Sequence, residues 1–264
     1  MGKIIAIVNN KGGVGKTTIT VNLGHALANK GSDVLIVDMD NQCNATSTFF
    51  QQVPEDTLYE LLDSDGTDPN KCIYPTPYDR VFFLPNTEDS GGLEPIFMTR
   101  DDRGYNLLQE RLRDYAIGKY DFTLIDCPPN LGLFTLQALT AADFVICPVT
   151  GGSKFAAIGL DRTIRTIKYV QESLNPHLRF LRLVLNQLDR REGVDKAFIT
   201  SAMTNYPGLV FETMIPRCTA VKQAEALGQT VIRSAPKATA TIKFRKLANE
   251  LLEMFDGKEN EGGI

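Results

Sequence analysis

The sequence predicts an α/β fold in which a mostly parallel, twisted sheet carries helices on both faces. Short apolar runs rich in β-favouring residues alternate with longer segments of helical periodicity, an order typical of parallel sheets. The runs are almost continuously hydrophobic, as expected of strands that are buried on both faces. The chain has 264 residues, a length at which α/β proteins often form a single domain.

The expected strands follow the apolar runs, and the expected helices lie between them. Strands are predicted over 3–8, 33–38, 80–85, 121–126, 143–149 and 180–186, with a further one over 209–213. Helices are predicted over 16–30, 104–117, 156–173, 194–205, 217–227 and 237–256. Pro, Gly and polar residues predict surface loops over 63–79 and 87–103. We expect residues 1–255 to form the domain and the polar, glycine-rich residues 256–264 to be a disordered tail.

Composition narrows the class of protein. The chain is 43% hydrophobic and 23% charged, which is ordinary for a globular protein in solution. A run of about 18 apolar residues is missing, and the first strand leaves no room for a signal peptide, so a cytoplasmic location is expected. Five scattered cysteines indicate reduced thiols, and two histidines argue against a histidine-rich metal centre. A net charge of −4 excludes a protein that is basic overall but allows a local basic patch.

A glycine-rich segment follows the first predicted strand. Residues 9–18 read Asn-Asn-Lys-Gly-Gly-Val-Gly-Lys-Thr-Thr and come before a predicted helix. Glycines in this order let backbone N–H groups point at phosphate oxygens, and the positive end of the helix favours the same anion. The sequence therefore predicts a P-loop NTPase domain whose nucleotide contacts are Lys11, Gly12, Gly13, Val14, Gly15, Lys16, Thr17 and Thr18.

Lysine and threonine side chains of this loop have separate expected roles. Lys16 would reach the terminal phosphates, and the Thr17 hydroxyl would bind Mg²⁺. The loop is a variant of the general pattern, because Asn10 replaces the first glycine and a second lysine, Lys11, follows it.

Carboxylates follow two of the predicted strands at the ends where ligands bind open parallel sheets. Alternation along an extended segment would point Asp38 and Asp40 in the same direction. One could bind Mg²⁺ through water, and the other could orient a water molecule toward the γ-phosphate. Asp126 ends an apolar strand, the position of the Mg²⁺-side carboxylate in P-loop NTPases, and Cys127 beside it is expected to be a packing residue. Ordinary surface carboxylates in a turn are the alternative for Asp38 and Asp40.

Three motifs together resemble the ParA/MinD family of deviant Walker-A ATPases, and its short ParA/Soj-like branch in particular. They are Lys11-Gly-Gly-Val-Gly-Lys-Thr-Thr, Asp38-x-Asp-x-Gln-x-Asn-Ala-Thr and Asp126-Cys-Pro-Pro. Ile215-Pro-Arg also fits that branch. Asn41 stands where the family usually has proline and Cys43 where it usually has glycine, and neither change removes a carboxylate.

The resemblance implies a role for each matching residue. ATP and Mg²⁺ would be the cofactors of a slow, partner-stimulated ATPase, and Lys11 would cross the interface of an ATP-bound homodimer to the partner's phosphates. Asp40 would position the attacking water, while Asp38 and Asp126 would support Mg²⁺ with Thr17. Asn186 would face adenine, with Pro216 packed nearby, although a strand-end turn residue is the alternative for Asn186.

The resemblance also implies where the ATPase cycle acts. Relatives bind double-stranded DNA non-specifically as ATP-bound dimers and leave it when a ParB-like or adaptor protein stimulates hydrolysis, which predicts a nucleoid-associated protein. Basic residues gather in the C-terminal half of the chain, as expected of a nucleic-acid footprint. The residues favoured for DNA contact are Arg190, Arg191, Arg217, Lys222 and Arg233. Solvated helix faces are the alternative for these side chains.

Two other functions compete with DNA positioning. A MinD-like ATPase that cycles on membranes would need an amphipathic anchor, and residues 237–256 are amphipathic. Acids on the polar face of that segment favour packing on the core, so no stable membrane anchor is expected. Residues 88–94 weakly resemble a nitrogenase iron protein, but no cysteine follows them where a cluster ligand is needed.

Overall fold

A seven-stranded sheet with the order β3-β4-β2-β5-β1-β6-β7 organises the protein. The structure is a computed structural model that describes residues 1–99, 104–151, 154–189 and 191–257. All strand pairs are parallel except β3–β4 at one edge. The strands are β1 (Lys3–Ile7), β2 (Val34–Asp38), β3 (Tyr74–Pro75), β4 (Val81–Leu84), β5 (Phe122–Asp126), β6 (Phe144–Thr150) and β7 (Arg179–Asn186). The predicted fold class is confirmed.

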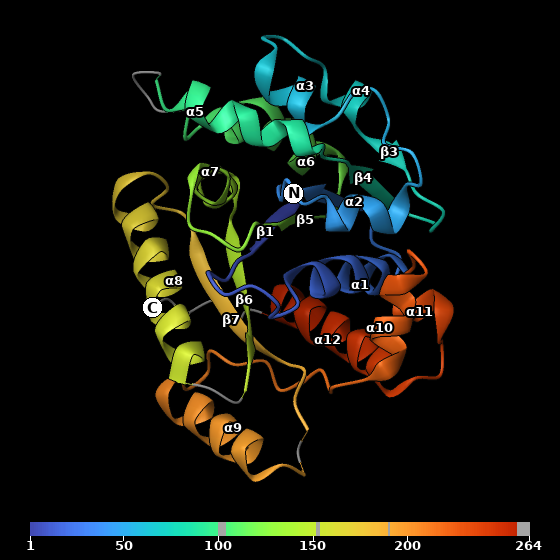
Figure 1. Cartoon of the computed structure of the whole chain (residues 1–264), viewed down its shortest axis with the longest axis vertical. Coiled ribbons are helices and arrows are strands. Elements are labelled where there is room, and N and C mark those ends of the chain that lie inside the picture. Colours follow the sequence, from blue (N-terminus) through green and yellow to red (C-terminus); the bar gives the residue numbers. More distant parts are fainter. Residues whose placement is uncertain (100–103, 152–153, 190, 258–264) are drawn as a thin grey trace.

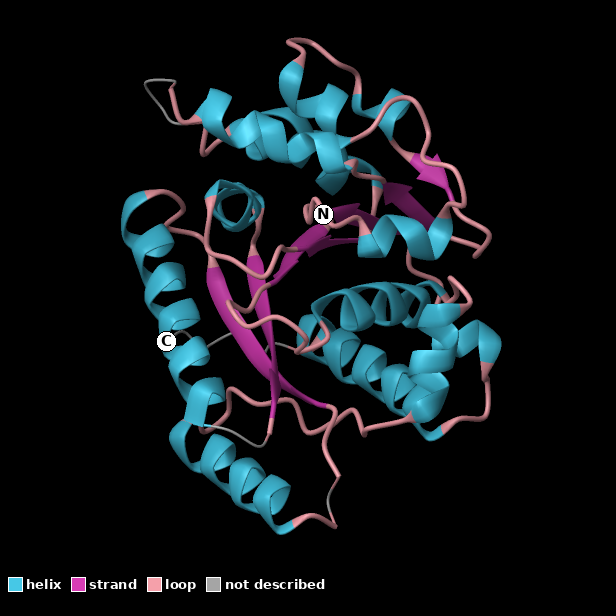
Figure 2. Ribbon diagram, viewed as in Figure 1, coloured by secondary structure: helices cyan, strands magenta, loops and turns pink. Residues whose placement is uncertain are grey.

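Helices cover both faces of the sheet (Figures 1 and 2). The residues that share a core with one face lie on α1 (Lys16–Ala28), α2 (Asn44–Phe49), α10 (Thr219–Ala226), α11 (Val231–Ser234) and α12 (Thr239–Asp256). The other face is covered by α3 (Leu58–Asp63), α4 (Pro69–Cys72), α5 (Leu93–Phe97), a π-helical turn (Gln109–Arg113) that continues into α6 (Asp114–Lys119), α7 (Leu133–Ala141), α8 (Lys154–Ser173) and α9 (Gly193–Asn205). Successive side chains of β1 point to opposite faces of the sheet and so belong to two separate cores. Ile5 and Ile7 face the first group of helices, while Ile4 and Ala6 face the second.

Strand register brings the functional loops to one edge of the sheet. Asp126 at the end of β5 is paired with Ile7 of β1 on one side and with Asp38 of β2 on the other. The segments that follow these three strands therefore leave the sheet side by side. This edge is the one at which open parallel sheets bind ligands.

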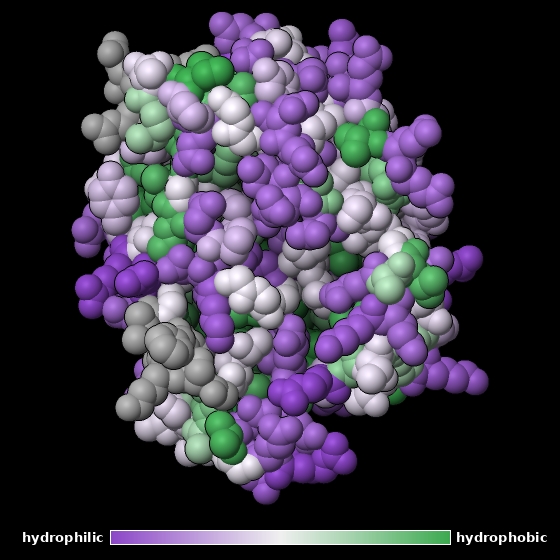
Figure 3. Space-filling model, in the orientation of Figure 1, coloured by the Kyte–Doolittle hydropathy of each residue, from purple (hydrophilic) through white to green (hydrophobic). Residues whose placement is uncertain are grey.

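Helix α12 packs on the core, as its pattern predicts. Phe244, Leu247 and Leu251 are fully buried, and the Phe255 ring lies 5.0 Å from the ring of Phe144. Within the described part of the chain, no helix is long and apolar enough to cross a membrane. The face shown in Figure 3 is dominated by hydrophilic side chains, with apolar residues scattered in small groups.

The prediction of a strand over 209–213 is wrong. Only an isolated bridge joins Val210 to Leu183 of β7. The backbone N–H groups of Glu212 and Thr213 donate to the carboxylate of Glu250 instead, at 2.7 and 3.0 Å. The backbone donor that could have continued a ladder at Thr213 is therefore used by a side chain of α12.

The predicted loops over 63–79 and 87–103 contain short ordered elements. Helix α4 and strand β3 lie in the first, and a 3₁₀ turn (Glu88–Gly92) followed by α5 lies in the second. Four further short helices, α2, α3, α7 and α11, were not predicted. Helix α12 runs to Asp256, and residues 258–264 of the predicted tail lie outside the described residues.

Candidate functional site

The loop between β1 and α1 has a conformation that requires glycine. Gly13 and Gly15 have φ values of 73° and 88°, in the left-handed region that other residues rarely adopt. A Cβ atom on Gly15 would also lie 2.2 Å from Nδ2 of Asn186. Both backbone conformation and space therefore exclude a side chain at this position.

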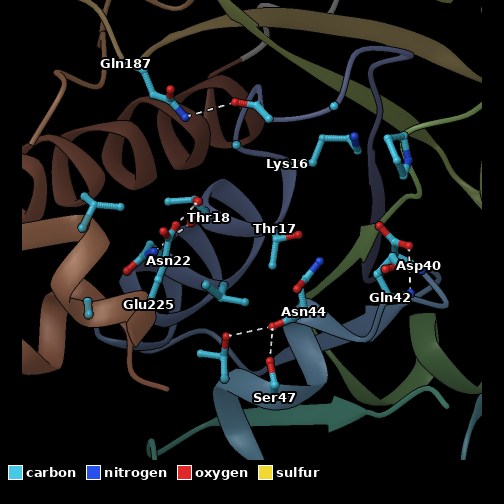
Figure 4. Close-up of a pocket in the computed structure, with 18 of the residues that line it drawn as sticks. Lys16, Thr17, Thr18, Asn22, Asp40, Gln42, Asn44, Ser47, Gln187 and Glu225 are labelled. Atoms are coloured by element: carbon cyan, nitrogen blue, oxygen red, sulfur yellow. Dashed lines mark hydrogen bonds between the residues drawn. The ribbon is translucent and has the colours of Figure 1, made fainter. Parts of the chain in front are cut away.

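A cavity of about 450 Å³ opens beside this loop, and its size suits a small-molecule ligand. Figure 4 shows Lys16 and Asp40 toward one end of it and Thr18, Asn22 and Glu225 toward the other. Most of its wall comes from the loop, α1, the segment after β2, α2 and α10. The residues are Gly12, Gly13, Gly15, Lys16, Thr17, Thr18, Val21, Asn22, Asp40, Gln42, Asn44, Ser47, Thr48, Pro129, Gln187, Val221, Ala224, Glu225 and Gln229.

Lys16 and Thr17 connect the loop to the end of β5. The Thr17 hydroxyl donates a hydrogen bond of 2.6 Å to Asp126, and Thr20 donates to the other oxygen of that carboxyl at 3.3 Å. Lys16 is 7% exposed, and its Nζ lies 3.5 Å from the carbonyl oxygen of Lys11. Burial lowers the pKa of Lys16, whereas the charge of Asp126 acts in the opposite direction.

Asp126 and Asp38 are both fully buried. Burial raises the pKa of Asp126 to about 8, and the neighbouring Asp38 adds to this shift. Burial likewise raises the pKa of Asp38 to about 6. A positive charge bound nearby would offset the cost of ionising this pair.

Of Asp38, which ends β2, and Asp40, which follows it, only Asp40 lines the cavity. Its Oδ1 accepts the backbone N–H of Gln42 at 3.0 Å. The carboxyl group of Asp38 is held by Thr46, which donates its backbone N–H and its hydroxyl to Oδ2 at 2.8 and 2.7 Å, and by the N–H of Asp40 at 3.1 Å. Asp38 thus fixes the backbone that carries Asp40.

The residues present suit a divalent cation only together with phosphate. Among the residues that the structure describes, no group of three or more His, Cys, Asp or Glu side chains could hold a metal ion alone. Mg²⁺ is usually held by one or two carboxylates, water and substrate phosphates. Thr17 and Asp126 beside the phosphate loop fit this second kind of site.

Lys11 lies differently from the rest of the loop. The described residues that line the cavity do not include it. Its backbone N–H donates to Oδ1 of Asn9 at 2.9 Å, and its Cβ lies 3.6 Å from where a Cβ of Gly159 on α8 would be. Its side chain therefore starts on the α8 side of the loop.

A smaller cavity of about 130 Å³ adjoins the first one and includes both predicted adenine-side residues, Asn186 and Pro216. Asn186 is 1% exposed and donates its Nδ2 to the carbonyl oxygen of Val14 at 2.7 Å. It therefore braces the phosphate loop, a role that its place at a strand end did not indicate. Gln187, in the left-handed region with a φ of 55°, adds a weaker contact of 3.3 Å to the carbonyl oxygen of Gly13.

The basic residues favoured for DNA contact do not all lie at one place on the surface. Arg217 and Lys222 both line the smaller cavity, whereas Arg233 lines a separate one beside Tyr78. Arg217 pairs with Glu192 at 3.4 Å. Arg191 pairs with Asp189 at 2.7 Å, and this arginine lowers the pKa of the aspartate. Arg190 lies outside the described residues.

The chain matches known proteins over most of its length. A family model described as an AAA domain matches residues 2–180. The sporulation initiation inhibitor protein Soj of Bacillus subtilis is 36% identical over 253 residues, which are 95% of this chain and 98% of Soj. The chromosome partitioning protein ParA of Myxococcus xanthus is 34% identical over 255 residues, or 96% of this chain and 89% of that protein.

The chain belongs to the ParA/MinD family of ATPases. A solved structure of cobyrinic acid a,c-diamide synthase from Mycobacterium smegmatis, with a bound ATP analogue and magnesium, is 28% identical to this family member. The two superimpose with a TM-score of 0.84 over 100% of both chains. The ParA/MinD fold is thus shared with an enzyme that holds both kinds of ligand.

Proposed function

We propose that this chain is a Mg²⁺-dependent ATPase whose ATP-bound homodimer binds DNA and positions a cargo in the cytoplasm. Lys11 carries the proposal, because it belongs to the phosphate loop yet stands outside the cavity of its own subunit. A lysine placed there can serve a nucleotide in a facing subunit. The partitioning function named for the ParA relative supports the same reading. We assign residues 1–255 to this ATPase domain.

ATP and Mg²⁺ fit the larger cavity. Bound Mg²⁺ would neutralise charge on the phosphate oxygens. Thr17 and Asp126 would hold the cation, with Asp38 on the neighbouring strand supporting the site, and Lys16 would bind the terminal phosphates. Asp40 would hold the attacking water in line, because it is the one aspartate of its pair that reaches the cavity. The base would enter the smaller cavity between Asn186 and Pro216.

Lys11 would complete the site across a dimer interface. A cation supplied by a second subunit stabilises charge that develops in phosphoryl transfer, as an arginine finger does. Hydrolysis would then require dimerisation. A ParB-like or adaptor protein would stimulate this step and release the dimer from the nucleoid.

The proposed DNA contacts are Arg190, Arg191, Arg217, Lys222 and Arg233. Arg191 and Arg217 are paired with acids at the surface, where solvent screens the charges and makes ion pairs weak. DNA phosphates could therefore replace the acids at little cost. Binding of this kind would be independent of sequence and would weaken with salt.

DNA retention in a gel shift with ATP, with ADP and without nucleotide tests the proposal. We expect retention only with ATP, and none for Lys16→Ala, which removes the cation that binds the terminal phosphates. Arg191→Ala should keep nucleotide binding and lower the slope of log affinity against log salt by about 0.9. Equal retention in all three states, or in none, would refute the proposed cycle.

A further inference from the structure

The two cavities meet at a shared wall. Thr18, Gln187, Val221 and Glu225 line both the larger, phosphate-side cavity and the smaller, base-side cavity. In any nucleotide the sugar joins the base to the phosphates. A nucleotide that fills both cavities must therefore place its sugar beside these side chains.

Among the described residues of this shared wall, Glu225 is the one that is charged. It lies in the last turn of α10, a helix that is anchored by Ala224, which is 2% exposed. Its Oε1 accepts the hydroxyl of Thr18 at 2.6 Å, and the carbonyl oxygen of Thr18 accepts Nδ2 of Asn22 at 2.8 Å. Figure 4 shows Glu225, Thr18 and Asn22 grouped at the end of the larger cavity away from Asp40. The carboxylate is thus held at the junction of the two cavities.

A carboxylate at this point restricts what can lie next to it. An ionised carboxylate only accepts hydrogen bonds, and a phosphate placed against it would be repelled. The hydroxyl groups of ribose are the donors that a ribonucleotide presents between base and phosphates. Acidic side chains bind sugar hydroxyls in the same way in dinucleotide-binding folds.

We propose that Glu225 accepts a hydrogen bond from a ribose hydroxyl and selects ribonucleoside over deoxyribonucleoside triphosphates. The inference rests on the proposed function, because it takes an adenine nucleotide to span both cavities. Glu225 is a specificity residue in this scheme and is separate from the hydrolytic groups around Asp40. The Thr18 contact sets the position of the carboxylate before the nucleotide arrives.

Affinities of the full chain for ATP, 2′-deoxyATP and 3′-deoxyATP, measured with Mg²⁺ by calorimetry, test the inference. The wild type should bind ATP about tenfold or more tightly than at least one deoxy analogue, since hydrogen bonds to charged groups are among the stronger ones. Glu225→Ala should bind ATP more weakly and lose the discrimination. Glu225→Gln, which keeps an acceptor without charge, should retain part of it.

Gln223→Ala is the matched control, because Gln223 is exposed on the same helix and lines neither cavity. It should discriminate as the wild type does. Equal affinity of the wild type for all three nucleotides would overturn the role of Glu225 and leave the ATPase proposal intact. Tighter binding of all three nucleotides by Glu225→Ala would also overturn it. The carboxylate would then serve only to hold α10 against Thr18 through their hydrogen bond. A wild type that binds no nucleotide would refute both proposals.

Discussion

The carboxyl group of Asp126 is fully buried beside Thr17 and Thr20, where burial raises its pKa to about 8. An unfolded chain would restore its ordinary value of 3.8. Between these values the folded state holds a proton that the unfolded state has released. Folding stability therefore falls as pH rises toward about 8.

The melting temperature without nucleotide should accordingly fall as pH is raised from about 6.5 to 8.5. Asp126→Asn has no proton to lose, so its melting temperature should fall less over the same range. Burial lowers the pKa of Lys16, which gives a slope of opposite sign at higher pH and is present in both proteins. Identical slopes in a thermal scan of the two proteins would contradict the assignment.

At the scale of elements, α5 holds the start of α7 near the site. Helix α7 begins at Leu133 after Gly132, a cap residue that has no side chain to offer. Oε1 of Glu94 on α5 accepts the backbone N–H of Leu133 at 3.0 Å and so supplies the cap from another element. The loop between Asp126 and α7 includes Pro129, which lines the larger cavity. Glu94 therefore positions a segment of the cavity wall without touching the cavity.

Glu94→Ala should lower the free energy of unfolding by about 1 kcal/mol, the usual effect of losing a helix cap. It should also lower the hydrolysis rate at saturating ATP, because the loop after β5 loses its anchor. Glu94→Gln keeps an acceptor and should restore most of both quantities. Exposed Glu88→Ala is the control for charge, and denaturant unfolding with steady-state kinetics measures the two effects. If Glu88→Ala lowered the free energy of unfolding and the hydrolysis rate as much as Glu94→Ala, the capping contact would not explain either effect.

The sequence could predict the strands that are continuous apolar runs, and it missed several short helices. Strands β2 and β5 are apolar runs that are buried throughout, so they were predicted to within a residue or two. Helix α7 was missed because its residues are buried all round, which leaves no polar face to reveal a helical period. In the site, the glycines, Lys16 and Thr17 follow from local order along the chain. The contact of Glu225 with Thr18 joins residues 207 positions apart, and only the packing of α10 on the loop creates it.

At the scale of the whole molecule, Lys16 and Lys11 of the same loop are expected to serve different subunits. Lys16 is 7% exposed and lines the larger cavity, whereas Lys11 does not line it. Lys16→Ala should therefore abolish nucleotide binding by the single subunit. Lys11→Ala should leave that affinity unchanged. It should lower the hydrolysis rate by about 10³-fold, the lower end of the range for a catalytic cation supplied in trans.

Calorimetric nucleotide titration, light scattering with ATP and a steady-state ATPase assay separate the two variants. Lys11→Ala should also fail to form the ATP-dependent dimer that the wild type forms. A loss of nucleotide affinity in Lys11→Ala equal to that in Lys16→Ala would place both lysines in the same site of one subunit.

The contacts that hold the phosphate loop also affect the order in which the site can form during translation. Thr17, Val14 and Thr18 are contacted by residues 109, 172 and 207 positions further along the chain. A ribosome delivers the N-terminal loop first and these partners long afterwards. The growing polypeptide therefore carries its phosphate loop without these contacts until Asp126, Asn186 and Glu225 have been added. A nucleotide site that depends on these contacts can therefore form only after β7 and α10 have emerged.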